Sequence, residues 1–179
     1  IFFVVPARKS VPADLRLSEQ VRGIGHVFGS LTFWRIAPWA TLSQAAYLSI
    51  HGLWAGPWLR DVAGLGRGHA AGILLLVGVA MMAGYIILGV LAERLSRRGI
   101  APLSVAVAGM VLFMVMLMLV TVQVPVAPAL VWPLFGFFGT SGILVYAVLS
   151  QSFESRLAGR ANTALNLLVF VVAFGFQWG

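Results

Sequence analysis

The chain has 179 residues, of which 60% are apolar and only 9% are charged, and its formal net charge is +7. Its mean hydropathy is +0.98. Soluble domains carry about 25% charged residues, so this composition excludes a water-soluble monomer. It also excludes a disordered chain, which would need low hydrophobicity and high charge. The composition predicts an all-α, polytopic membrane protein with room for roughly four to six helical spans.

The chain contains no cysteine, which excludes disulfides, thiolate metal sites and cysteine nucleophiles. Its three histidines, His26, His51 and His69, are too scattered for a metal motif, and no serine has the flanking glycines of a nucleophile elbow. We therefore expect no enzymatic activity, no metal and no cofactor. The basic residues are spread over several loops, which favours topological anchoring in a membrane over nucleic-acid binding.

The N-terminal part is predicted to lie outside the bundle. Residues 1–5 are apolar but stop at Pro6, so they look like the tail of a preceding transmembrane helix. Residues 6–32 form a polar stretch that we expect to be a cytoplasmic loop. Apolar side chains recur within it at helical spacing, at Leu17, Val21, Ile24, Phe28 and Leu31. This pattern predicts a short amphipathic helix at the membrane surface.

Residues 33–179 are predicted to form a bundle of transmembrane helices, because amide groups in lipid must be hydrogen-bonded within the span. The expected helices cover about 33–58, 70–92, 101–122, 129–151 and 161–179. The polar segments between them alternate between two sides of the membrane. Ten of the twelve basic residues fall on the side of Arg8, and only Arg60 and Arg67 fall on the other. The positive-inside rule makes the side of Arg8 cytoplasmic.

The most specific motif follows the second predicted span. Residues 89–99 read Gly-Val-Leu-Ala-Glu-Arg-Leu-Ser-Arg-Arg-Gly. This segment resembles the loop signature G-x-L-A-D-R-x-G-R-R of the major facilitator superfamily, with Glu93 in place of the usual aspartate and Ser96 in place of a glycine. Residues 157–162 resemble the segment that opens helix eleven in that family, and residues 52–58 give a softer match to the outer end of helix seven. A charge cluster that merely anchors the helix would explain the arginines, but not Gly89 or the position of the loop.

The resemblance covers nearly the whole chain and implies the C-terminal half of a bacterial transporter, from the end of helix six to helix eleven. It implies a secondary active transporter in the inner membrane that moves a small solute by alternating access. The implied partners are a small-molecule substrate, a proton as a candidate co-substrate, the lipid bilayer and an N-terminal half of the same protein. A non-transporting sensor or subunit of the same fold is the alternative. The implied conformational loop motif consists of Gly89, Glu93, Arg94, Arg97 and Arg98.

Substrate-cavity candidates are the polar residues inside the predicted spans, because such residues usually face a cavity or a neighbouring helix. In the first span, Gln44, Tyr47, His51, Trp54 and Trp58 recur at helical spacing and form one stripe. The stripe either lines the cavity or packs on another helix. Its opposite face, at Leu42 and Ala45, is expected to tolerate other apolar side chains.

Further candidates are Thr140, Tyr146 and Asn166. Gly136, Gly139 and Gly142 recur every three residues beside Thr140, a spacing that suits close helix packing or, less readily, binding. Asn162 shares a helix face with Asn166, but it is also a candidate cap for its helix. No Asp or Glu lies inside a predicted span, so a proton-coupling carboxylate is expected outside this half.

The predicted topology can be tested with single cysteines, because the chain has none of its own. Cysteines at positions 8, 97 and 160 should react only with reagents that reach the cytoplasm. Cysteines at 60 and 67 should react from outside. Labelling of position 97 from outside intact cells would overturn the orientation.

Overall fold

The computed structural model describes residues 17–123 and 126–178, and the side chains from Arg22 onward. The predicted helix tail at 1–5 and residues 6–16 of the predicted loop lie outside the described residues. The described part is helical and contains no strand. Four of its helical segments are long and apolar enough to cross a membrane, namely Arg67–Ser96, Pro102–Thr121, Pro128–Gln151 and Ser155–Trp178. The chain is therefore an all-helical protein of the multi-pass membrane type, as its composition predicted.

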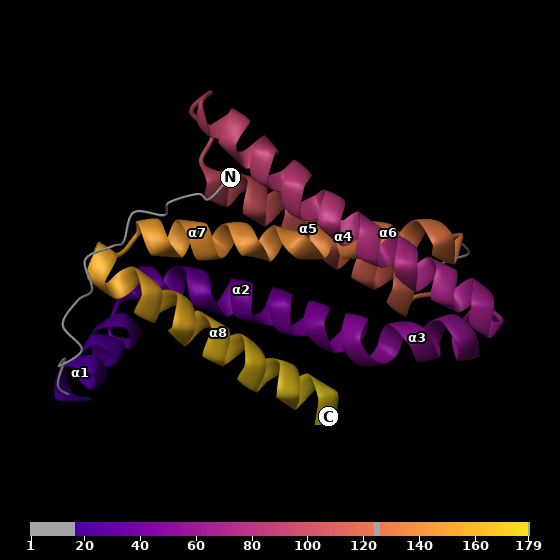
Figure 1. Ribbon diagram of the computed structural model, residues 1–179, viewed down its shortest axis with the longest axis horizontal. Coiled ribbons are helices and arrows are strands. Elements are labelled where there is room, and N and C mark those ends of the chain that lie inside the picture. Colours follow the sequence, from indigo (N-terminus) through magenta and orange to yellow (C-terminus); the bar gives the residue numbers. More distant parts are fainter. Residues whose placement is uncertain (1–16, 124–125, 179) are drawn as a thin grey trace, which may run out of the picture.

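The helices follow one another in an up-and-down order (Figure 1). The short helix α1 precedes a helical run from residue 31 to residue 62, and the remaining helices form four long segments. The elements are α1 (Leu17–Phe28), α2 (Leu31–Ser49), η1 (Ile50–Trp54), α3 (Ala55–Pro57), η2 (Trp58–Val62), α4 (Arg67–Ser96), α5 (Pro102–Thr121), α6 (Pro128–Gly139), η3 (Thr140–Gly142), α7 (Ile143–Gln151) and α8 (Ser155–Trp178).

The bounds of the observed helices differ from those of the predicted spans. The run 31–62 corresponds to the first predicted span, but it is not among the four segments above, because Arg35, Gln44 and His51 lower its hydropathy. Within this run, η1 and η2 are π-helical. Helix α8 begins six residues before the predicted start at 161. The backbone N–H groups of Leu157 and Ala158 both donate to the Glu154 carbonyl oxygen, which closes the first turn.

Helix α4 ends in a Schellman motif. Ile100 N–H donates to Leu95 O at 3.0 Å, and Gly99 N–H donates to Ser96 O at 3.0 Å. Gly99 has a φ of +83°, a left-handed conformation that costs other residues about 1–2 kcal/mol. Pro102 then begins α5, where its missing N–H is not needed. Gly99, the last residue of the segment 89–99, thus terminates α4, a role that the sequence analysis did not recognise.

The packing of the bundle depends on close approaches at glycine. Helix α4 lies along α6, α2 lies along α8, and α5 packs on both α6 and α7. A Cβ at Gly84 would lie 2.5 Å from Thr140 Oγ1 and 2.6 Å from the Phe137 carbonyl oxygen. A Cβ at Gly109 would lie 2.4 Å from Ser141 Cβ. Because these two glycines have no side chains, the backbones of α4 and α5 can pack closely against the central segment of residues 128–151.

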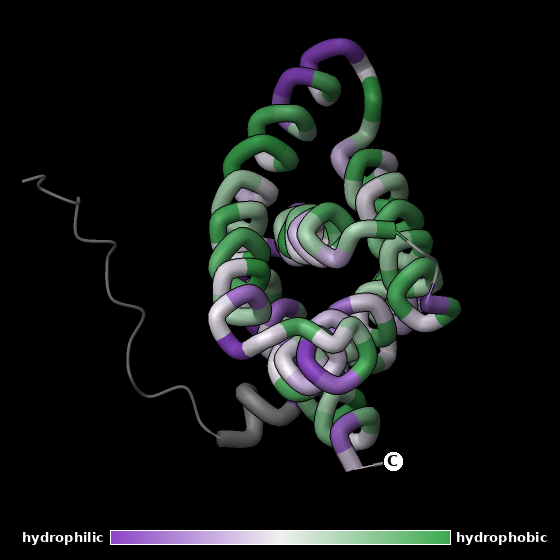
Figure 2. The backbone as a smooth tube through the Cα atoms, turned by 90° about the vertical axis from the view of Figure 1, so that its right-hand side faces the viewer, coloured by the Kyte–Doolittle hydropathy of each residue, from purple (hydrophilic) through white to green (hydrophobic). Residues whose placement is uncertain are grey.

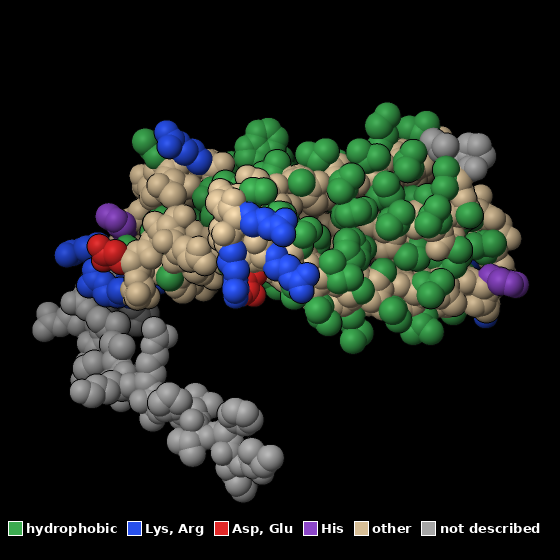
Figure 3. Space-filling model, turned by 90° about the horizontal axis from the view of Figure 1, so that it is seen from above, with side chains coloured by type: hydrophobic (Ala, Val, Ile, Leu, Met, Phe, Trp, Pro, Cys, Tyr) green, Lys and Arg blue, Asp and Glu red, His purple; other side chains and the backbone are tan. Residues whose placement is uncertain are grey.

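The surface of the bundle is suited to a membrane. Most of each long helix is hydrophobic, and hydrophilic residues gather in the loop after α4 (Figure 2). Arginines concentrate toward one end of the molecule, while an apolar surface covers most of the rest (Figure 3). In the described part, seven arginines belong to one end of the helices, and Arg60 and Arg67 belong to the other. The seven are Arg22, Arg35, Arg94, Arg97, Arg98, Arg156 and Arg160.

The glycine contacts predict a sharp difference between two positions of α4. Gly84→Val should destabilise the folded protein by about 1–3 kcal/mol, because the added atoms meet the backbone of α6. Gly78→Val, in the same helix, should be nearly neutral, because no described atom lies within 4 Å of a Cβ at Gly78. Denaturation of both variants in the same detergent would compare their stability. Equal stability would contradict this account of the packing.

Candidate functional site

The central helical segment is interrupted halfway along its length. Residues Thr140–Gly142 form a 3₁₀ turn, η3, between α6 and α7. The Ile143 N–H points to the Thr140 carbonyl, three residues back, instead of the Gly139 carbonyl that it would meet in an α-helix. The Thr140 hydroxyl donates to Phe137 O at 2.7 Å. The break therefore shifts the backbone hydrogen-bonding pattern in the middle of the bundle.

Gln44 from α2 reaches into this break. Its side-chain Nε2 donates to the Gly139 carbonyl oxygen at 3.1 Å. In an apolar interior, a carbonyl without its helical partner costs free energy unless another donor replaces it. Gln44 supplies that donor from a residue 95 positions earlier in the chain. The amide thus joins α2 to the interrupted helix at mid-span.

Two of the glycines predicted to form a stripe make room for α2 at the same place. A Cβ at Gly142 would lie 2.0 Å from Gln44 Nε2, and a Cβ at Gly139 would lie 2.3 Å from the Tyr47 ring. Gly136 lies against Val77 of α4 instead, where a Cβ would be 2.8 Å from a Val77 methyl group. The glycine stripe is thus a packing surface that receives side chains from two helices.

Tyr47 lies at the centre of an aromatic cluster. Its ring stacks on His51 at a centroid distance of 5.6 Å. It also contacts Phe135 at 5.6 Å and Phe113 edge-on at 5.9 Å. Tyr47 is 4% exposed, and its hydroxyl has no hydrogen-bond partner among the described residues. A buried hydroxyl is normally satisfied, so this group is available to a water molecule or a ligand.

Two further hydroxyls in this region are buried and have no hydrogen-bond partner within the part of the chain that the structure describes, those of Thr41 in α2 and Ser141 in η3. Thr41 is one helical turn before Gln44. The sequence analysis missed it, although its spacing of three residues from Gln44 places it on the same stripe. We call Thr41, Gln44, Tyr47, Thr140 and Ser141 the polar seam. The seam is our candidate functional site, because it concentrates unsatisfied polar groups in the middle of the bundle.

The predicted stripe of the first span does not continue as one face. Trp54 is 56% exposed, whereas Trp58 packs on Trp132 at 5.5 Å. The π-helical turns of η1 change the number of residues per turn, so the spacing expected for an α-helix fails after residue 50. The contacts of Gln44 and Tyr47 agree with the packing alternative, while a role in lining a cavity stays a prediction.

The two residues named on the opposite face of the first span differ in their burial. Leu42 is 49% exposed, but Ala45 is fully buried. Ala45 lies one turn before Ser49, whose hydroxyl donates to the Ala173 carbonyl of α8 at 3.0 Å. Helix α2 therefore packs against α8 near this position. Ala45 is buried, and its tolerance of other apolar side chains stays a prediction.

Two other candidates, Tyr146 and Asn166, come together between α7 and α8. The Tyr146 hydroxyl donates to Asn166 Oδ1 at 3.2 Å. Asn162, one turn earlier, donates to Ser150 Oγ at 2.7 Å. The alternative that Asn162 caps its helix is wrong, because α8 begins at Ser155 and Asn162 lies inside it. Tyr146 and Asn166 form a second polar contact, separate from the hydrogen bonds of the polar seam.

The predicted loop motif lies at the end of α4 and in the turn after it. Arg97 Nη2 lies 2.6 Å from Glu93 Oε1, and both side chains are largely exposed. The pair joins two residues of the loop motif one helical turn apart, and an exposed pair of this kind contributes about 0–1 kcal/mol. Arg94 and Arg98 are exposed. No described atom lies within 4 Å of a Cβ at Gly89, so packing within the described residues does not require a glycine there.

Comparison with known proteins gives no relative: no protein-family model, curated protein or solved structure matches this chain. The assignment of a function therefore rests on the residues and contacts described above.

The polar seam predicts opposite effects for two substitutions. Gln44→Ala should destabilise the protein by about 1–3 kcal/mol, because it leaves the buried Gly139 carbonyl without its donor. Tyr47→Phe should leave stability unchanged or raise it, because the lost hydroxyl has no partner. Leu42→Ala, on the exposed side of α2, serves as the control. A destabilising Tyr47→Phe in the same unfolding assay would show that the hydroxyl has a structural partner.

Proposed function

We propose that this chain is the C-terminal half of a secondary active transporter of the major facilitator type. It would move a small solute across a bacterial inner membrane by alternating access. The multi-pass helical architecture supports the proposal, as does the position of the loop signature at the C-terminal end of a membrane-length helix. The basic end of the bundle would face the cytoplasm, because arginine in short loops is retained on that side.

The observation that carries the proposal is the polar seam at the interrupted helix. Non-helical backbone at membrane depth is tolerated only where protein buries it or where it lines a cavity, and transporters build their substrate sites near such breaks. Here the break at Thr140–Gly142 lies beside one half-buried amide and three buried hydroxyls, those of Thr41, Tyr47 and Ser141, that have no partner among the described residues. Buried hydroxyls are normally hydrogen-bonded, so these groups are suited to bind a polar solute.

The seam would bind an uncharged or zwitterionic solute in this half. Its groups are an amide, hydroxyls and aromatic rings, and it contains no carboxylate or guanidinium. Tyr47 and His51 present stacked rings beside the seam, which suits a substrate with an apolar face. Alternating access would require α2 to move relative to η3, so the Gln44–Gly139 hydrogen bond would form in one state and be exchanged for substrate or water in another.

The direct test is transport by the full-length protein reconstituted in liposomes. We expect saturable uptake of at least one solute from a panel of labelled sugars, polyols, amino acids and nucleosides, with or without an imposed proton gradient. Tyr47→Phe should change the affinity for that solute while the protein remains folded. Saturable binding without uptake for the whole panel would favour the alternative, a non-transporting sensor of the same fold.

The loop motif is proposed to control the exchange between conformations. Arg94 is exposed at the end of α4, far along the helix from the polar seam. Arg94→Ala should therefore lower the transport rate about tenfold or more, while equilibrium binding of the solute stays within severalfold. Arg67→Ala, at the other end of α4, is the matched control and should transport normally. Weak binding combined with normal exchange in Arg94→Ala would contradict this role.

A further inference from the structure

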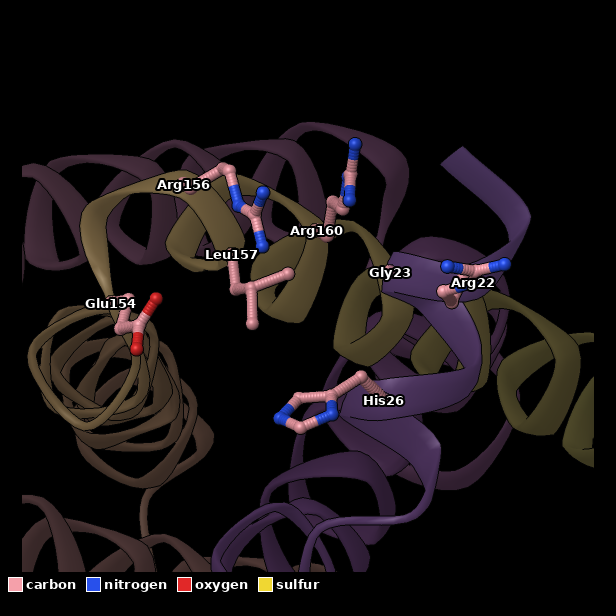
Figure 4. A pocket seen from close by; sticks show the side chains of 7 residues that line it. All are labelled: Arg22, Gly23, His26, Glu154, Arg156, Leu157 and Arg160. Carbon is pink, nitrogen blue, oxygen red and sulfur yellow. The ribbon is translucent and has the colours of Figure 1, made fainter. Parts of the chain in front are cut away.

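The basic end of the bundle contains a cavity between α1 and the start of α8. Its volume is about 340 Å³, within the size range of small-ligand sites. In Figure 4, Glu154, Arg156 and His26 point toward the opening from different sides, and Arg22 and Arg160 lie along its rim. Three guanidinium groups and one carboxylate therefore surround it, so the cavity is suited to an anionic group.

A second cavity adjoins the first and is mainly apolar. It has a volume of about 440 Å³, and both cavities share Arg156 and Arg160. Its apolar lining comes from Ile24 and Phe28 of α1 and from Ala164 and Leu167 of α8. From Gly159 to Leu167 the groove follows α8 for about 12 Å, at 1.5 Å per residue. It thus leads from the charged end of the helix toward the apolar part of the span.

The two cavities lie at the depth expected of a membrane interface. The Trp34 indole N–H donates to the Phe28 carbonyl at the end of α1, at 2.6 Å. Tryptophan favours the boundary between hydrocarbon and headgroups. Helix α1 is amphipathic and lies against the start of α8, where the Arg160 guanidinium packs directly on Gly23. The groove therefore opens where a lipid of one leaflet would lie beside the protein.

We propose that these joined cavities bind one anionic phospholipid, with its phosphate among the arginines and an acyl chain in the apolar groove. Arg156 and Arg160 line both cavities, so a single occupant that fills both must carry an anionic group attached to a long apolar tail. A free phosphate would fill only the first cavity.

The test uses the purified full-length protein and native mass spectrometry. Dioleoyl phosphatidylglycerol should bind to one site at least fivefold more tightly than dioleoyl phosphatidylcholine. Arg156→Gln and Arg22→Gln should each weaken binding of phosphatidylglycerol about fivefold. Arg98→Gln removes an exposed arginine of the same end that lines neither cavity. Its affinity should stay within twofold of the unaltered protein.

A separate substitution tests the apolar groove proposed to hold the acyl chain. No described atom lies within 4 Å of a Cβ at Gly159, so Gly159→Phe should fill the groove without disturbing the fold. It should weaken phosphatidylglycerol binding at least fivefold. Normal lipid binding by Gly159→Phe, together with displacement of the lipid by millimolar inorganic phosphate, would assign the site to free phosphate and overturn the proposal. Equal binding of the two lipids, or no effect of Arg156→Gln and Arg22→Gln, would also overturn it.

Discussion

A backbone carbonyl in the middle of an apolar bundle needs a hydrogen-bond donor, and much of this structure follows from how that need is met at Gly139. The 3₁₀ turn at Thr140–Gly142 removes the donor that the helix would normally provide. Water is scarce at this depth, so the replacement comes from Gln44 of α2. The contact requires α2 to approach the turn closely, and Gly139 and Gly142 make that approach possible. One local irregularity thus fixes the position of another helix.

The contacts around the η3 break are of a kind that can be exchanged when helices move relative to one another. The contacts around the break consist of one amide hydrogen bond, glycine approaches and aromatic rings, and ion pairs play no part in them. Such contacts can be exchanged for similar ones without leaving a buried charge unpaired, which would be far more costly. At the end of α4, the Glu93–Arg97 pair is exposed and equally easy to break. Neither region is held by an interaction strong enough to lock the molecule in one state.

Hydrophobic periodicity predicted the helical class and the apolar helices well, because long uncharged stretches have few other structures in lipid. The spacing of Gly136, Gly139 and Gly142 also indicated a packing surface. Features that depend on local backbone geometry could not be predicted. The π-helical turns place Trp54 on the surface although its spacing puts it on the stripe with Tyr47. Ser49 of α2 donates to Ala173, 124 residues later in the chain, and no pattern near Ser49 encodes this contact.

Arginine at the basic end has more than one physical role. Positive charge in short loops orients a helical membrane protein, but orientation requires only that the charges lie on one side. Orientation does not require Arg156 and Arg160 to line both a charged cavity and an apolar groove. It also does not require a glycine at position 23, where the Arg160 side chain packs against the backbone of α1. Helix α1 closes one side of both cavities, and α8, which closes the other, also packs along α2. A lipid bound there would therefore contact the same helix that supports the polar seam through Ser49 and Ala173. The composition of the membrane would then affect the seam through the position of α8, without any direct contact between lipid and substrate.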